Sequence, residues 1–373
     1  MAHTPSPVQQ KLSAIRQALR GSVLERESLI DGMMTALIAK EMLFVLGPPG
    51  TGKSKICEAL CGAITGGEYF QYLLGKTSTP EELYGPFSLK GLQNDQYLRI
   101  TKGKLPEAHV AFLDEIWKSN GAVLNTLLPI INERVMFNDG RKQIPLQMMV
   151  AASNEIPTSE ELAAIYDRFS LRYVVEALRD DDNFRKMLET GRRKAQIPTI
   201  SLSELGDAQS AAENLPVPSL TIEKMVELRR AVQEKEIFVS DRKFNQALSI
   251  AKAYAYLMGH SEVEVEDLTI LENVLWHNPD QFSEIRTLVR KLCNPVGEVL
   301  HRHLDSANTV MIQVRSGKMP GMEAFQKLQV SKTELDEMNE KSPREDVTEA
   351  VNKIGEMCKT LSETLFTSRL KKK

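Results

Sequence analysis

The most constraining feature of the chain is a short apolar run that ends in a loop rich in glycine and proline. Residues 42–46 are apolar, and they are followed by Gly47-Pro48-Pro49-Gly50-Thr51-Gly52-Lys53-Ser54. An apolar run this short, closed by Gly and Pro, is typical of a buried strand. The loop matches the pattern G-x-x-x-x-G-K-[ST], whose glycines let successive backbone N–H groups form a nest for phosphate. The sequence therefore predicts a strand, a phosphate-binding loop and a helix in that order.

The last residues of this loop have the chemistry that nucleotide phosphates require. Lys53 supplies a compact positive charge for the β- and γ-phosphates, and the Ser54 hydroxyl can ligate Mg²⁺. The helix that begins here adds the partial positive charge of its N-terminus. At ordinary glycine usage, a chance match in a chain of this length is on the order of one in a hundred. We therefore expect residues 47–54 to bind a nucleotide and Ser54 to be a magnesium ligand.

Three more short apolar runs follow, over residues 110–113, 148–152 and 171–175. Stretches with helical spacing of apolar residues separate them. Strands that alternate with helices imply a parallel sheet with helices on both faces. The sequence therefore predicts an α/β fold for this part of the chain.

Two carboxylates, Asp114 and Glu115, directly follow the run over residues 110–113, the second run of the chain. Ligands of parallel sheets bind beyond the carboxyl ends of the strands. Asp114 would then lie across from the phosphate-binding loop and hold Mg²⁺, and Glu115 would orient or deprotonate the attacking water. The alternative for Asp114 is a cap on the following helix.

Three further polar residues are candidates, and each has an ordinary structural alternative. Asn154 ends the third run and can hydrogen-bond the attacking water or the γ-phosphate, or it is a turn residue. Arg168 precedes the fourth run and could stabilise charge on a neighbouring subunit's nucleotide, or it forms a surface salt bridge. Arg242 begins a strongly patterned helix that Ser240 can cap; it could touch the γ-phosphate, or it is a solvated arginine.

The character of the chain changes after residue 180, where the apolar runs stop. We expect the α/β core to occupy residues 1–190 and a linker rich in Ser, Pro, Ala and Gly to occupy residues 191–218. The pattern over residues 219–280 predicts an all-helical domain. Residues 281–373 are expected to form a further, C-terminal helical region.

Composition excludes several classes of protein. Apolar residues make up 42% and charged residues 26%, which is ordinary for a globular chain. No run approaches the ~18 apolar residues of a membrane span, and no signal peptide is expected. The 4 cysteines are scattered, which favours a reducing, cytoplasmic compartment. The formal net charge of −3 gives no overall attraction to nucleic acid.

The order of these features resembles the AAA+ ATPases, which have an α/β core followed by a helical lid. Within that family, two segments are similar to inserts of the MoxR branch. Residues 79–108, which open with the capping box Thr79-Pro80-Glu81-Glu82, resemble its insert in helix 2. Residues 132–141, with the turn Asn138-Asp139-Gly140, resemble its hairpin before the sensor strand. Several other segments are similar to the RavA-type regulatory ATPases, although nothing after Phe282 resembles their inserted β-rich C-terminal module.

The resemblance implies an enzyme that hydrolyses ATP with Mg²⁺ in a homo-oligomeric ring, by family likeness a hexamer. It implies that Asn154 is the first sensor, that Arg242 is the sensor of the lid, and that Arg168 acts on the neighbour's nucleotide. Arg172 is the runner-up for that last role, because Asp-Arg-Phe-Ser-Leu-Arg contains two arginines. A protein partner with a von Willebrand factor A domain, a protein client and chaperone-like remodelling of complexes are also implied. The alternative function is a motor or loader that acts on nucleic acid.

Overall fold

The structure is a computed structural model that describes residues 5–157, 159–190, 196–341 and 343–370. By its internal contacts the chain divides into two units, Met1–Val289 and Arg290–Lys373, and each is described separately here. None of the helices in the described ranges is long and apolar enough to cross a membrane.

A five-stranded parallel sheet forms the centre of the first unit. Its strands are β1 (Leu43–Leu46), β3 (Tyr69–Leu73), β4 (Val110–Asp114), β7 (Met148–Ser153) and β8 (Leu171–Val174). They lie in the order β3-β4-β7-β1-β8, and every neighbouring pair is parallel. The four apolar runs of the sequence are thus confirmed as strands, and so is the α/β fold.

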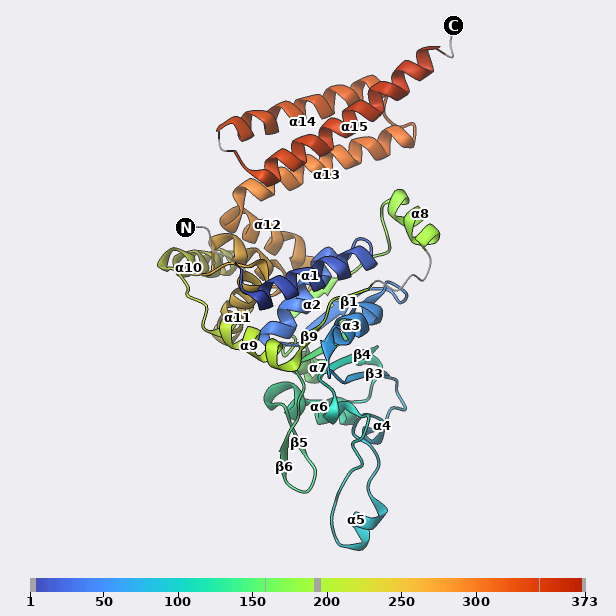
Figure 1. The fold of residues 1–373 in the computed structure, drawn as a ribbon, viewed down its shortest axis with the longest axis vertical. Coiled ribbons are helices and arrows are strands. Elements are labelled where there is room, and N and C mark those ends of the chain that lie inside the picture. Colours follow the sequence, from blue (N-terminus) through green and yellow to red (C-terminus); the bar gives the residue numbers. More distant parts are fainter. Residues whose placement is uncertain (1–4, 158, 191–195, 342, 371–373) are drawn as a thin grey trace. The chain divides into compact units, whose positions relative to one another are not determined.

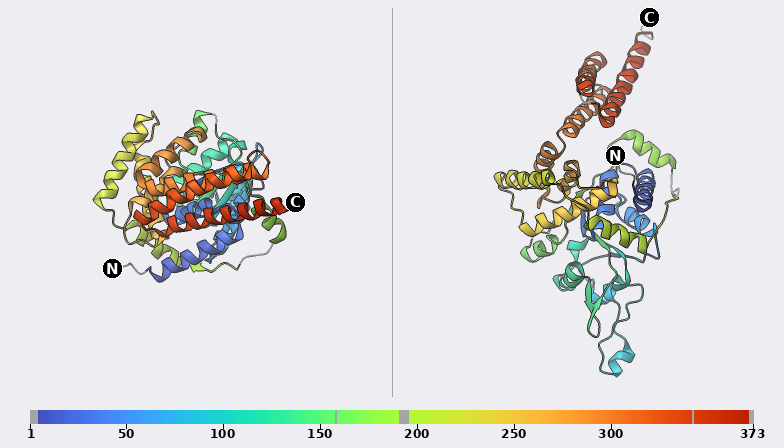
Figure 2. Two further views of the ribbon diagram at one scale, coloured as in Figure 1. Left: turned by 90° about the horizontal axis from the view of Figure 1, so that it is seen from above. Right: turned by 60° about the vertical axis from the view of Figure 1, so that its left-hand side comes forward.

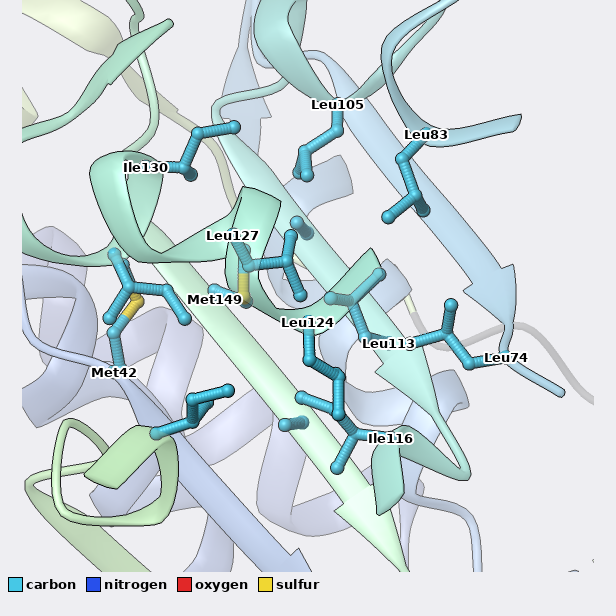
Figure 3. Close-up of a cluster of buried hydrophobic side chains, with 14 of the residues drawn as sticks. Met42, Leu74, Leu83, Leu105, Leu113, Ile116, Leu124, Leu127, Ile130 and Met149 are labelled. Carbon is cyan, nitrogen blue, oxygen red and sulfur yellow. The ribbon is translucent and has the colours of Figure 1, made fainter. Parts of the chain in front are cut away.

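Helices cover both faces of this sheet. On one face, α2 (Glu27–Ala39) and α3 (Lys53–Gly62) pack against the strands, with α1 (Pro7–Ser22) beside them. The other face is covered by α6 (Gly121–Glu133) and α7 (Glu160–Tyr166). Alternate residues of β4 and β7 meet this second layer, and Figure 3 shows α6 lying over these strands. Its labelled core residues include Leu113, Leu124, Leu127, Ile130 and Met149.

Two inserts extend from the second layer, as the resemblance implies. The first contains α4 (Pro80–Tyr84), which begins at the predicted capping box of Thr79 and Glu82, and α5 (Leu89–Gln93). The second is a hairpin of β5 (Val135–Phe137) and β6 (Arg141–Gln143). Asp139 and Gly140 have φ angles of 51° and 97°, which a tight hairpin turn requires. Figure 1 shows the hairpin and α5 extending on the same side of the sheet.

The segment that we expected to be a linker is largely structured. Residues 191–195 lie outside the described ranges, but β9 (Ile200–Ser201) pairs with β2 (Ile64–Thr65) and leads into α9 (Leu202–Glu213). Gln209 is buried, and its side-chain amide donates to the carbonyl oxygen of Leu37 at 3.0 Å. Most of this segment therefore belongs to the core.

The helical domain of the first unit consists of two long helices and several short ones. Its helices α10 (Ser219–Glu234) and α11 (Asp241–Met258) are followed by a 3₁₀ segment, Val265–Asn273. A shorter 3₁₀ turn, Pro279–Gln281, leads into α12 (Phe282–Cys293), which crosses the boundary between the units. A separate helix, α8 (Asp181–Thr190), follows the last strand of the sheet.

The second unit is a bundle of three long helices. They are α13 (Pro295–Arg315), α14 (Gly321–Lys341) and α15 (Glu345–Leu370). The helices lie side by side in Figures 1 and 2, and they share a core that contains Leu328 and Ile354. The described part of this unit consists of helices joined by short connections and has no strand, so it contains no β-rich module.

Candidate nucleotide-binding site

Three adjacent strands end at one edge of the sheet and carry the candidate residues there. Leu46 of β1 is in register with Ser153 of β7, and Leu113 of β4 is in register with Ala151. The phosphate-binding loop, Asn154 and the pair Asp114 and Glu115 therefore follow neighbouring strands that all run in the same direction. The sheet thus brings these predicted residues to one edge.

The phosphate-binding loop has the backbone conformation that its glycines allow. Gly50 and Gly52 have φ angles of 81° and 85°, in the left-handed region. Gly47 is required for a different reason, because a Cβ there would lie 2.1 Å from the carbonyl oxygen of Val175. The N–H of Gly47 also donates to the carbonyl oxygen of Ser153 at 2.9 Å, which ties the loop to β7.

Lys53 is buried beneath the loop. Its ammonium group donates to the carbonyl oxygens of Gly47 at 2.6 Å and Pro48 at 3.1 Å. Burial lowers the pKa of Lys53, and the charges of Asp114 and Glu115 partly oppose that effect. A buried ammonium held mainly by carbonyl oxygens is stabilised by a negatively charged ligand such as phosphate.

Glu115 has an unusual backbone conformation and an unsatisfied carboxylate oxygen. Its φ angle is 52°, which is uncommon for a residue with a side chain, and its N–H donates to Asp114 Oδ1 at 3.1 Å. Lys118 pairs with Oε1 at 3.2 Å. Oε2 is buried and has no hydrogen-bond partner among the described residues. Since buried polar atoms are normally paired, this oxygen is available to a water molecule or a ligand.

The oxygen atoms at this edge suit magnesium. The candidate ligands are the Ser54 hydroxyl and the Asp114 carboxylate. A 3₁₀ turn, Ile116–Lys118, follows directly with Glu115 at its N-cap, and Asn120 caps α6, so Asp114 is the cap residue of neither. The described residues contain no cluster of three or more His, Cys, Asp or Glu side chains that could hold a metal. Mg²⁺ prefers such sparse sites, because it keeps several waters and binds substrate phosphates through one or two protein oxygens.

Arg168 and Arg242 lie together at the opposite edge of the sheet. They line a cavity of about 410 Å³, whose walls include Lys40 and Met42 just before β1, and Gln147 just before β7. The length of β1, at about 3.3 Å per residue, separates this edge from the phosphate-binding loop of the same chain. Arg242 is therefore not placed beside its own chain's loop, where a lid sensor acting within one subunit would lie.

Arg172, the alternative to Arg168, is buried in β8. Its guanidinium contacts the carbonyl oxygen of Trp276, lies 3.0 Å from His277 Nδ1 and stacks over the Tyr166 ring at 4.3 Å. A side chain that is 0% exposed cannot reach a neighbouring subunit. Arg168 differs from Arg172 in that it lines the larger cavity, and its Nε is buried and has no partner within the described ranges.

Sequence reasoning gave no role at the cavity of Arg168 and Arg242 to three residues that lie near it. Glu41 is largely buried, and burial raises the pKa of its carboxyl group although it contacts the Ser170 hydroxyl. Lys243 is buried beside it in α11. Arg134, at the base of the hairpin, donates to the carbonyl oxygen of Lys40 at 2.5 Å. No sequence pattern marks them, because their burial depends on how the helical domain and the hairpin pack on the core.

Comparison with known proteins agrees with this geometry. Residues 10–212 match the model of the MoxR domain in the MoxR-vWA-beta-propeller ternary systems, and residues 220–289 match an AAA lid domain. Two uncharacterised proteins of Methanocaldococcus jannaschii are 36% and 35% identical, over 82% and 76% of this chain and 80% and 76% of their own.

Among solved structures, a proposed ATPase from Cytophaga hutchinsonii shares the fold, with a TM-score of 0.62 and 15% identity. The match covers 76% of this chain and 94% of that one. The family model alone spans more than half of the sequence. The chain belongs to the MoxR family of AAA+ ATPases.

Proposed function

We propose that this protein binds ATP with Mg²⁺ at residues 47–54 and hydrolyses it. The main support is that three kinds of functional group follow adjacent strands at the same edge of the sheet. They are the loop with Lys53, the carboxylates of Asp114 and Glu115, and the amide of Asn154. Ser54 and Asp114 would hold Mg²⁺, which would neutralise charge on the phosphates. Phosphoryl transfer to water needs positioning and charge stabilisation, and these groups supply both.

Glu115 is the group that we assign to the attacking water. Its Oε2 is buried and unpaired, so it can accept a hydrogen bond from water, while Lys118 holds the other oxygen. Asn154 follows the strand between β4 and β1 and is exposed, so its amide can hydrogen-bond that water or the γ-phosphate. A carboxylate at this position orients the water and accepts its proton.

The two arginines support a ring in which subunits meet head to tail. The phosphate-binding loop lies at the carboxyl edge of the sheet, and Arg168 and Arg242 lie at the other edge. A contact between unlike edges repeats from one subunit to the next and closes into a ring when the rotation allows. We infer that both arginines act on the neighbour's γ-phosphate, where an arginine stabilises transition-state charge. Six subunits is the number that the family resemblance implies.

The two inserts, residues 79–108 and the hairpin of residues 135–143, together form a projection that we call the arm. The arm runs from the cavity of Arg168 and Arg242 to an exposed end, which we call its tip. Arg134 and Gln143, at the base of the hairpin, line the same cavity as Arg168. Near the hairpin turn, buried Asn138 accepts from the Arg99 N–H at 2.6 Å and donates to the Arg99 carbonyl oxygen at 3.3 Å. A change at the neighbour's nucleotide would therefore move the hairpin and the first insert together.

The exposed apolar side chains at the tip of the arm favour a protein as the client. Leu89, Tyr97 and Phe137 are 77%, 73% and 70% exposed. Exposed apolar side chains gathered on one projecting element mark contacts with other proteins. A nucleic-acid groove would instead need a dense basic surface. We propose that hydrolysis drives this tip against a protein complex and remodels it.

A von Willebrand factor A domain protein is the partner that we propose. The support is the matched family model, whose description places its MoxR domain in systems with such a protein. The likeness to RavA-type ATPases stays a prediction from the sequence.

The three-helix bundle of residues 295–370 is a separate unit that is available for docking.

Hydrolysis is tested by comparing two matched variants. Glu115→Gln should bind ATP as tightly as the wild type and lose nearly all turnover, because it removes the carboxylate that accepts the proton. Glu155→Gln, an exposed carboxylate one residue after Asn154, is the control and should retain turnover. Phosphate release and nucleotide binding are measured on each. Full turnover by Glu115→Gln would contradict the assignment.

A further inference from the structure

A second, smaller cavity lies between the core and the helical domain, apart from both features described above. Its volume is about 170 Å³, several times the roughly 30 Å³ that a water molecule occupies in the liquid. Core residues Asp167 and Arg172 line one wall. Residues 238–240 and Lys243, at the start of α11, line another, and His277 completes the lining with Val274 and Leu275.

The buried interior of this cavity is cationic, and its outer part is exposed. Arg172 and Lys243 are 0% and 4% exposed, whereas Phe238 is 85% exposed. Arg172 Nε, which is also buried, has no hydrogen-bond partner in the part of the chain that the structure describes. A ligand entering past Phe238 would therefore meet two buried cations.

Carboxylates balance these cations only in part, because no ion pair with Lys243 is found among the described residues, although Glu41 and Asp167 lie near it. Lys243 donates to the carbonyl oxygen of Phe169 at 3.1 Å, and Arg172 has one distant ion pair, 3.6 Å from Asp167. Burial and the nearby Arg172 lower the pKa of His277, which disfavours a third positive charge in this cavity. Buried charges without a close counter-ion are costly, so a bound anion would stabilise this arrangement.

The charged groups around Lys243 also indicate that a bound anion would stabilise this cavity. Burial is the main cause that lowers its pKa, to about 7; Arg172 and Arg242 add to the effect, and Asp167 and Glu41 oppose it. The N-terminus of α11 contributes further positive potential, and Ser240 caps it by accepting from the Lys243 N–H at 3.2 Å. An anion beside Lys243 would restore its positive charge at neutral pH.

We propose that this cavity binds a small inorganic oxyanion, of the phosphate or sulfate class, between Arg172 and Lys243, and that the anion holds the helical domain on the core. This inference does not depend on ATP hydrolysis. The tetrahedral oxyanion would accept from the Lys243 ammonium group, the Ser240 hydroxyl and the Arg172 guanidinium, which line the cavity together. Each of these groups can donate a hydrogen bond to the oxyanion without first losing a hydrogen bond to a carboxylate.

Sulfate is the right probe, because its charge stays constant between pH 6 and 8.5. Its binding is measured by calorimetric titration at constant ionic strength on the full chain, with and without saturating ADP. We expect saturable binding that Lys243→Met weakens roughly tenfold or more, the loss expected for a hydrogen bond to a charged group. Lys252→Met is the matched control, since it removes a cation of the same helix that does not line the cavity, and it should leave binding unchanged.

Two further results separate a binding site from a structural lysine. Among the described residues that line the cavity, Asp167 alone carries a carboxylate, so Asp167→Asn should tighten sulfate binding, opposite in sign to Lys243→Met. Binding to the wild type should also be tighter at pH 6 than at pH 8.5, and Lys243→Met should lose that dependence. Equal sulfate binding by Lys243→Met and Lys252→Met would overturn the proposal. Displacement of sulfate by ADP would also overturn it, because the anion would then belong to the nucleotide site.

Discussion

The two hydrogen bonds between Asn138 and Arg99 allow a quantitative test of whether the hairpin holds the first insert in place. Asn138→Ala removes both hydrogen bonds of a buried side chain to the Arg99 backbone, at 2.6 and 3.3 Å. Each such bond contributes about 1 kcal/mol, so the attachment of the first insert to the hairpin should weaken by about 2 kcal/mol. That loss raises the local opening of the insert roughly thirtyfold.

Hydrogen exchange measured peptide by peptide gives this increase in the local opening of the first insert directly. Amides of residues 86–104 should exchange faster in Asn138→Ala, and Asn138→Asp, which keeps only the acceptor, should lie between it and the wild type. Lys142→Ala, an exposed change in the same hairpin, is the control. Exchange in residues 110–114 of the central strand should not change. Exchange in the insert within twofold of the wild type would refute the coupling, and so would equal acceleration in β4.

Three further predictions concern the loop, the core and pH. Gly47→Ala should weaken nucleotide binding at least tenfold in a binding titration, because its Cβ would lie 2.1 Å from the Val175 carbonyl oxygen and displace the loop. Phe44→Ala, which empties a buried site ringed by three aromatic side chains, should lower the free energy of unfolding by about 3–5 kcal/mol in urea. The hydrogen bond with Asp267 raises the pKa of His260. The stability that it contributes is full below the unfolded pKa of about 6.5 and is lost as pH rises through the folded value. The difference in melting temperature between wild type and His260→Gln should therefore be larger at pH 6 than at pH 8.5.

Local patterns predicted the centre of the fold because they are set by adjacent residues. The apolar runs of β1, β4 and β7 are largely buried, so each is continuous in the sequence. Strand β8 lies at one edge of the sheet and contains Arg172, and its β-branched and aromatic residues predicted it. Strand β3 was missed because it lies at the sheet edge, where Tyr-Phe-Gln-Tyr-Leu mixes exposed and buried positions. Helix α9 was missed among Ser and Ala residues, although Ser201-Leu202-Ser203-Glu204 has the capping-box pattern that begins it.

The candidate site was predictable only where one strand positions each residue. Lys53, Asp114 and Asn154 each follow an apolar run, so the direction of a parallel sheet places them at one edge. The positions of Arg168 and Arg242 depend on how the helical domain packs on the core. The sequence could not separate Arg168 from Arg172 for the same reason, since burial against Trp276 is a tertiary contact.

The central claim is that each catalytic site joins the loop of one subunit to the arginines of the next. It is tested most directly by mixing two inactive variants, Lys53→Ala and Arg168→Ala, and measuring ATP turnover. At a mixed contact, the intact loop of the Arg168→Ala subunit meets the intact Arg168 of the Lys53→Ala subunit. The account predicts that the mixture recovers activity that neither variant has alone. A mixture as inactive as its components, in rings shown to contain both chains, would contradict it.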